Sequence, residues 1–354
     1  MLYIINMAVI TDQTLAQMTS RFLNQPSRTE GNKLETSAIA GAKAPAKRPR
    51  EAERRIPHPW GLEWPSLLVA ALIYTGFLVL TWHYRDLPWW LLLPLGAYLV
   101  AWHGSLQHEV VHGHPTSKPW LNELIVLPSL WLWIPFRIYR QSHLQHHDNS
   151  RLTDPLYDPE SFYLSAADWS ASPWWKRKLL TAQNSGLGRL LLGPAVTVSR
   201  LYWQEGRRFL RGDFRHLGAW LLHLLAVAPV LVWVVVVCEI PLHAYLLLFV
   251  YPGISLTLLR SFIEHQAAEA EGERTVIVEA GPVFSLLFLN NNLHAVHHAA
   301  PGLPWYRLPE VWRHRRAQIL AGNGGYHYRG YLQVLWRHLL RAKEPVLHPI
   351  PTRS

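Results

Sequence analysis

The chain has 354 residues, of which 49% are hydrophobic and only 16% are charged, whereas a soluble domain carries roughly 25% charged residues. This composition argues against a soluble protein. A single cysteine, Cys238, excludes an intramolecular disulfide, a cysteine-based zinc site and an iron–sulfur cluster, so any bound metal must be held by histidine and carboxylate side chains.

The first 56 residues are polar and basic and show little hydrophobic periodicity. Such a composition cannot bury enough apolar surface to fold, so we expect a disordered segment. Several lysines and arginines gather just before the first apolar run, where they would contact anionic lipid headgroups. They are Lys43, Lys47, Arg48, Arg50, Arg54 and Arg55.

Four runs without a charged residue follow, at 65–82, 87–107, 216–238 and 240–259. Each approaches or exceeds the roughly 20 residues that cross a bilayer as a helix. Very short connections join the runs into pairs, which predicts two helical hairpins. The apolar stretches 120–136 and 275–293 are interrupted by proline, glycine, asparagine or glutamate, so we expect that neither of them spans the membrane.

The basic residues indicate an orientation. Arg85 is the only lysine or arginine in the two predicted hairpin turns, although the chain contains 34 of them. Because cytoplasmic loops carry the positive excess, we expect both termini and the central loop on the cytoplasmic side, as in a bacterial inner membrane. The net charge of +10 then reflects contact with membrane lipids rather than with nucleic acid.

These patterns predict an all-α, multi-pass integral membrane protein with four transmembrane helices and a helical cytoplasmic cap. We expect a disordered basic segment at 1–56, the membrane domain at 57–320 and a cytoplasmic C-terminal tail at 321–354.

Three histidine clusters stand out. The first is His108-Glu-Val-Val-His112, and the other two, 143–147 and 294–298, share the pattern H-x-x-H-H. Residues three or four apart share one face of a helix, so His143 can converge with His146 or with His147. An even number of spans separates the clusters, which places all three at the same membrane face. Together they offer enough imidazole ligands for more than one iron, copper or zinc ion.

An H-E-x-x-H motif followed by two H-x-x-H-H motifs, over roughly residues 60–320, resembles the three-histidine-box membrane fatty acid desaturases and their hydroxylase relatives. The resemblance implies a non-haem di-iron centre, two Fe ions held almost entirely by histidine. It also implies one further ligand after the last span, ahead of the third box. On this sequence the expected ligands are His108, His112, His143, His146, His147, His265, His294, His297 and His298.

Other residues near the boxes are weaker candidates. His103 precedes His108 by five positions, which turns about 140° around a helix, so we expect it beside the ligands or the substrate cavity. Whether His103 or His114 binds metal stays open. Glu109 and Glu264 each neighbour an expected ligand and are predicted to orient a histidine through its second ring nitrogen.

Acidic residues after the second box are the remaining candidates for this orienting role. Asp148, Asp154, Asp158 and Glu160 all lie in this segment. Turns built on Asp-Pro explain them equally well.

The resemblance implies an O2-dependent oxidoreductase that forms a double bond in a long, lipid-bound acyl chain and consumes two external electrons. The sequence contains neither an H-P-G-G haem-binding motif nor a glycine-rich dinucleotide motif. We therefore expect a separate electron donor, such as a ferredoxin.

Alternatives remain within and outside this class. A fatty acyl or carotenoid hydroxylase or ketolase would use related boxes. The H-E-x-x-H motif alone is typical of a zinc membrane protease, but that reading leaves the other two clusters unexplained. A non-enzymatic lipid-binding or metal-storing membrane protein is a further alternative.

Overall fold

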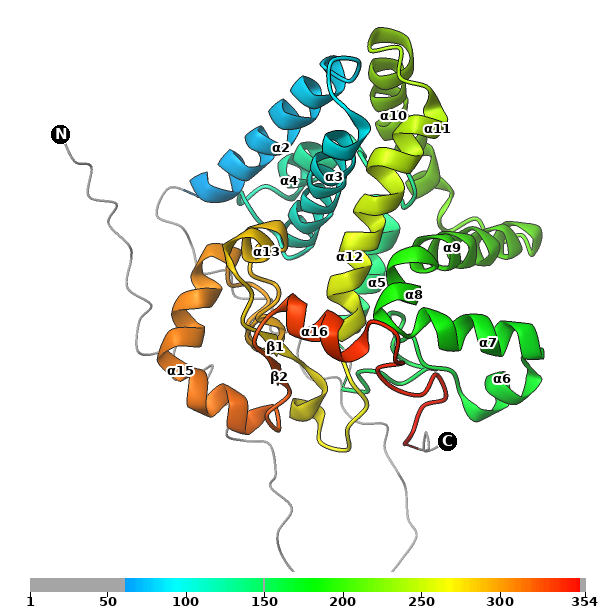
Figure 1. The fold of residues 1–354 in the computed structure, drawn as a ribbon, viewed down its shortest axis with the longest axis vertical. Coiled ribbons are helices and arrows are strands. Elements are labelled where there is room, and N and C mark those ends of the chain that lie inside the picture. The colour runs from blue at the N-terminus through cyan, green and yellow to red at the C-terminus, as the bar shows by residue number, and fades with distance from the viewer. Residues whose placement is uncertain (1–60, 149, 351–354) are drawn as a thin grey trace, which may run out of the picture.

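The computed structural model describes residues 61–148 and 150–350 (Figure 1). The predicted disordered segment and its basic cluster lie outside these described residues. Each of the four predicted apolar runs contains a long helix. The helices are α2 (Trp64–Trp82), α3 (Trp89–Val111), α10 (Leu217–Leu231) with its π-helical continuation η1 (Val232–Val237), and α11 (Leu242–Tyr245) continued by η2 (Leu246–Val250) and α12 (Tyr251–Glu264).

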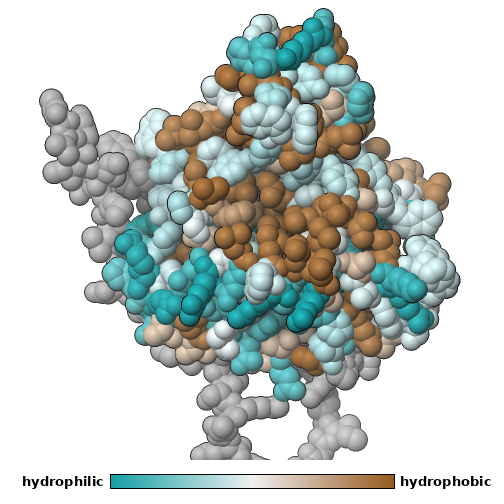
Figure 2. Space-filling model, viewed as in Figure 1, coloured by the Kyte–Doolittle hydropathy of each residue, from teal (hydrophilic) through white to brown (hydrophobic). Residues whose placement is uncertain are grey.

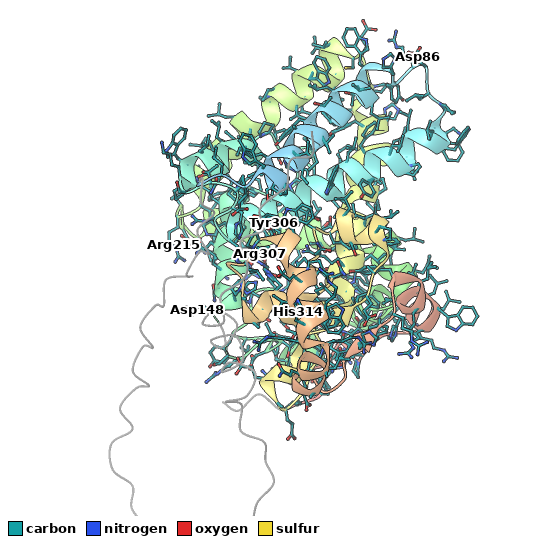
Figure 3. All side chains as sticks on the ribbon, turned by 90° about the vertical axis from the view of Figure 1, so that its left-hand side faces the viewer. Asp86, Asp148, Arg215, Tyr306, Arg307 and His314 are labelled. Atoms are coloured by element: carbon teal, nitrogen blue, oxygen red, sulfur yellow. The ribbon has the colours of Figure 1, made fainter. Side chains whose placement is uncertain are left out.

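The two predicted hairpins lie side by side. Arg85 in the first hairpin turn pairs with Glu239 in the second at 2.5 Å, and the Trp233 indole donates to Thr81 Oγ1 at 2.9 Å. Both turns therefore lie at the same end of the bundle. Figure 3 shows Asp86, in the first turn, far from Asp148 and His314, which lie toward the opposite end.

Three helices are long and apolar enough to cross a membrane: Trp64–Trp82, Leu217–Val237 and Leu242–Glu264. The helix α3 is not among them, because polar side chains such as His103, Gln107 and His108 occupy its last turns and lower its mean hydropathy. The structure thus supports three of the four predicted spans. The fourth span and the sidedness stay predictions. Figure 2 shows hydrophobic surface across the middle of one face, with hydrophilic surface on either side of it.

The helix α3 packs closely on η2 and α12 because a glycine on each side lies against a larger side chain of the other. A Cβ atom on Gly253 would lie 2.6 Å from the Cβ of Val100, and one on Gly96 would lie 2.6 Å from Cδ1 of Phe249 in the adjoining η2. Small residues of this kind let helix backbones approach in membrane proteins. Both helices run toward the histidine clusters, so this packing brings their C-terminal ends together.

Shorter elements make up the rest of the described fold and are called the cap here; its cytoplasmic location stays a prediction. They are α4 (Pro119–Val126), α5 (Phe136–His147), α6 (Ala166–Ala171), α7 (Trp174–Gln183), α8 (Gly186–Leu191), α9 (Gly193–Leu210), η3 (Glu271–Arg274), α13 (Pro282–Leu287), α14 (His294–Ala299), η4 (Trp305–Arg307), α15 (Leu308–Gly322) and α16 (Tyr331–His338). The stretches 120–136 and 275–293 contain only short helices, α4 and α13, so neither provides a spanning helix, as predicted.

The cap also contains a small parallel sheet, in which β1 (Ile277–Val278) pairs with β2 (His327–Tyr328). This sheet ties the predicted tail to the rest of the fold. In α16, Tyr331 and Val334 are almost fully buried. Beyond this helix, the Lys343 side chain donates to the backbone oxygen of His265. The predicted boundary at residue 320 therefore does not coincide with a break in packing, because strand pairing and burial anchor the described part of the tail.

The contact between α3 and α12 generates a prediction about stability. We expect Gly253→Ala to destabilise the folded protein by about 1–3 kcal/mol, because the new methyl group overlaps Val100 and the helices must separate. Gly218→Ala in α10 is the matched control, since a Cβ there meets no atom within 4 Å. Thermal unfolding in detergent measures both. Equal midpoints for the two variants would contradict the close packing.

Candidate metal centre

The structure brings together all nine histidines that the sequence predicts as ligands. They form two groups, and within each group one nitrogen per residue lies within 4.8 Å of all the others. The larger group contains His108, His112, His143, His147 and His297, and the smaller contains His146, His265, His294 and His298. The groups adjoin, since the rings of His147 and His298 stack with their centroids 4.2 Å apart.

Helix geometry decides how each H-x-x-H-H box divides between the groups. On α5, His143 and His147 enter the larger group and His146 the smaller; the box on α14 divides in the opposite sense, with His297 alone entering the larger group. Successive residues are about 100° apart around a helix, so relative to position i, position i+4 is rotated by about 40° in one direction and i+3 by about 60° in the other. Each box therefore contributes to both groups.

In the smaller group, the facing ring nitrogens of His265 and His294 cannot hydrogen-bond to each other, because neither of them carries a proton. Nδ1 of His265 donates to the Arg274 carbonyl at 3.3 Å, and Nδ1 of His294 donates to Asn291 Oδ1 at 3.0 Å. Because those oxygens only accept, each Nε2 atom of a neutral ring carries a lone pair. The two Nε2 atoms nevertheless face each other at 3.0 Å.

This spacing fits a shared metal ion. With metal–nitrogen bonds of about 2.1 Å, two ligands at right angles hold their nitrogens about 3.0 Å apart. The Nε2 atoms of His146 and His265 are also 3.0 Å apart, and in the larger group those of His143 and His147, and of His147 and His297, are 3.1 Å apart. The donor set, imidazole throughout, suits iron, copper and zinc.

Two carboxylates orient histidines of the second box. Nδ1 of His146 lies 2.8 Å from Asp158 Oδ1, and Nδ1 of His143 lies 3.1 Å from Glu160 Oε1. Such contacts fix the tautomer and direct Nε2 toward a metal. Asp158 is itself held rigidly, because its oxygens accept hydrogen bonds from the backbone N–H groups of Thr153 and Glu160.

Burial sets the charge of most of these rings. It lowers the pKa of five histidines well below the ordinary value, and the neighbouring imidazoles or cations lower it further. These are His147, His265, His294, His297 and His298. They are therefore neutral at neutral pH, which is the form that binds a metal.

His146 differs from the other rings. Burial alone lowers its pKa, but the negative charges of Glu160 and Asp158 outweigh burial and raise the pKa to about 9. In the same way, His143 and His146 overcome the effect of burial on Glu160 and lower its pKa to about 2. Both pKa shifts indicate that Asp158 and Glu160 favour a positive charge at the second-box histidines. A bound metal ion would supply such a charge.

Asn291 lies between the two groups. Its Oδ1 accepts from His294, and its Nδ2 lies 3.2 Å from Nε2 of His108. The sequence analysis assigns no role to this residue, although its place in three successive asparagines just before the third box is a signal.

Glu264 lies nearby, with Oε1 3.5 Å from Nδ1 of His294 and 2.8 Å from Nε of Arg260. The structure thus places Glu264 beside a predicted ligand.

The other weaker candidates lie elsewhere. His103 packs its ring against Tyr74 and belongs to neither group, and His114 pairs with Glu63 at 2.6 Å. Glu109 accepts a hydrogen bond from the Trp305 backbone at 3.1 Å, and its other oxygen is 3.8 Å from Nδ1 of His108.

Asp148 is exposed at the C-terminal end of α5. Among the described residues it belongs to neither histidine group. Asp158 and Glu160, farther along the same segment, are the acidic residues that contact the second-box rings.

A cavity of about 480 Å³ adjoins the centre, within the range of small-molecule sites. His143 and His265 contribute to its wall, so a molecule in the cavity reaches both histidine groups. Apolar side chains form another part of the wall, among them Trp131, Trp133 and Ile138.

Comparison with known proteins adds one finding. Residues 85–330, more than half of the chain, match the family model described as fatty acid desaturase. This match confirms the resemblance drawn from the histidine boxes. No curated protein matches the chain.

The geometry predicts the effect of removing the histidine outside the boxes. We expect His265→Ala to lower the bound metal of the purified protein toward half, because the smaller group would keep only three imidazoles. Elemental analysis of the metal per chain measures this. His103→Ala is the buried control and should keep the full content. A His265→Ala protein with unchanged metal content would remove His265 from the set of ligands.

A second prediction concerns Asp158. Asp158→Asn should weaken metal binding roughly 10–100-fold, as loss of an orienting carboxylate does elsewhere. Competition with a chelator of known affinity gives the dissociation constants. Asp148→Asn, the exposed control, should behave as the unmodified protein, and equal affinities for the two variants would argue against the orienting role.

Proposed function

Because the chain belongs to the fatty acid desaturase family, we propose that it introduces a double bond into a long, lipid-bound acyl chain with O2 and two external electrons. The family supports a function of the desaturase or hydroxylase type. The observation that carries the finer proposal is the convergence of nine imidazoles in two adjoining groups beside a partly apolar cavity.

The proposed cofactor is a pair of non-haem iron ions. The larger histidine group would hold one ion and the smaller group the other. When bound, the two irons supply the capacity to activate O2 for attack on an unactivated C–H bond, which side-chain acid–base chemistry cannot provide.

The chain's own residues would position the reaction and shield it. Asp158, Glu160 and Asn291 hold the rings in fixed tautomers, so the ligand nitrogens need little rearrangement. The apolar wall near Trp131 and Ile138 would exclude water from the acyl chain.

The proposed reaction balances as follows. Two vicinal C–H bonds of the acyl chain break and one carbon–carbon double bond forms. The two hydrogens, two further protons and two electrons from the donor reduce one O2 to two waters.

The structure favours this proposal over a zinc protease. A protease base must face an open position on the metal, where it activates water. Glu109 instead accepts a hydrogen bond from the backbone of Trp305, and His108 and His112 share their site with three other histidines.

An external carrier such as a ferredoxin is the proposed electron donor. The helix α15 packs against α14, which bears the third box, and exposes Arg313, His314 and Arg316. A basic surface so close to the centre would guide an acidic carrier by electrostatic attraction.

Product analysis tests the proposed function. Expression in a host that makes only saturated lipids should yield monounsaturated acyl chains, seen by mass spectrometry as a loss of two hydrogens. His147→Ala should abolish them, whereas His103→Ala should retain at least part of the activity. Chains that gain one oxygen instead would support the hydroxylase. Loss of both products, with metal-loaded protein and reduced donor present, would refute the oxidative function.

A further inference from the structure

The cavity beside the histidines contains several charged side chains, and nearly all of the buried ones have a partner of opposite sign. Glu205 pairs with Arg208 at 3.2 Å, and Glu264 pairs with Arg260 at 2.8 Å. The remaining acidic side chains of the wall, Asp158 and Glu160, accept from the second-box histidines, as described above.

Arg189, in α8, is the exception. It lines the cavity and is only 7% exposed, yet among the described residues no carboxylate pairs with it, and its Nε atom has no hydrogen-bond partner. Its guanidinium lies near the rings of Phe162 and Phe262, at 5.7 and 5.5 Å from their centroids. Contact with aromatic rings contributes about 0.5–2 kcal/mol, whereas burying an unpaired charge costs several kcal/mol.

A second buried cation lies close by. Lys343 is also near the Phe162 ring, at 5.5 Å, and pairs with Glu344 at 3.2 Å. Glu344 therefore neutralises Lys343, whereas Arg189 has no carboxylate partner among the described residues.

We propose that Arg189 binds the oxyanion of the substrate's head group, either a carboxylate or a phosphate, while the acyl chain occupies the cavity beside the histidines. A guanidinium forms two parallel hydrogen bonds with either group, which suits this recognition. The inference rests on the proposed function, since it assigns the head group of the same substrate. It makes Arg189 a residue that selects acidic lipids over neutral ones.

The place of Arg189 in the fold agrees with this role. The helix α8 packs against α12 and against α16 (Figure 1). Phe262, next to the guanidinium, precedes His265 by three residues, and Lys343 donates to the backbone of His265. The same elements thus position the proposed head-group site and one of the metal-binding histidines.

Binding of three matched probes tests the proposal without turnover. Hexadecanoate, hexadecyl phosphate and hexadecanol share one chain and differ only in the head group. Tritiated probes bind to the purified protein in neutral detergent, and each dissociation constant is compared between the unmodified protein and Arg189→Gln. We expect Arg189→Gln to weaken binding of at least one anionic probe by about tenfold or more and to leave hexadecanol unchanged.

Two further variants sharpen this comparison. Arg189→Lys keeps the charge and should restore part of the affinity. Arg211→Gln removes an exposed arginine outside the cavity wall and should change nothing. A loss confined to hexadecanoate identifies a carboxylate head group, and a loss confined to hexadecyl phosphate identifies a phosphate.

Other outcomes would overturn the proposal. Equal weakening of all three probes would mean that Arg189 only supports packing, and no weakening would mean that it does not touch the ligand. If the anionic probes respond but no lipid is oxidised, the site stands and the desaturase proposal fails. If double bonds form but the probes do not discriminate, only the head-group assignment fails.

Discussion

The fold around the candidate centre depends on one electrostatic constraint: nine imidazole rings, in two groups, hold one nitrogen each within 4.8 Å of the others in the group. Nδ1 of His265 and of His294 both donate outward, so their Nε2 lone pairs face each other at 3.0 Å. Lone pairs in that arrangement repel unless a cation lies between them. A metal ion would remove this repulsion, so the arrangement of the rings, rather than their number, makes the site a candidate metal centre.

Holding the rings in this arrangement requires rigid support from two directions. Close packing of α3 on α12, through Gly96 and Gly253, fixes the ends of the two helices from which His112 and His265 project. The cap provides the rest, since Asp158 and Glu160 orient the second box. Asn291 also contacts both histidine groups at once. The described part of the C-terminal segment completes the support through β2 and Lys343.

The cavity wall has three chemically different parts, which together would orient a substrate. Aromatic and aliphatic side chains such as Trp131 and Ile138 suit an alkyl chain, His143 and His265 suit the metal, and Arg189 suits an anionic head group. A substrate with an acidic head and a long tail satisfies all three parts of the wall. The unpaired charge of Arg189 and the facing lone pairs of the histidines share one feature. In both places the described residues provide no group of opposite charge, and under the proposal the ligand provides it.

Much of this protein follows from the sequence alone. Long charge-free runs impose helices wherever they occur, and the predicted runs match α2, α3, α10–η1 and α11–α12 closely. The nine candidate ligands were named from the resemblance of the three histidine boxes to the desaturase family, which also implies a further histidine after the last span, here His265, and the structure brings all nine together. The sequence did not distinguish among the acidic candidates after the second box, of which Asp158 and Glu160 contact the rings while Asp148 is exposed.

Only the tertiary structure decided how the histidines divide between the two groups. Helix spacing separates His146 from His143 and His147, but which group each enters depends on how α5 is rotated against α14, and local spacing does not fix that rotation. The structure likewise revealed Asn291, the unpaired Arg189 and the anchored C-terminal segment. Each of these depends on contacts between residues far apart in the chain, and such contacts leave no periodic signal in the sequence.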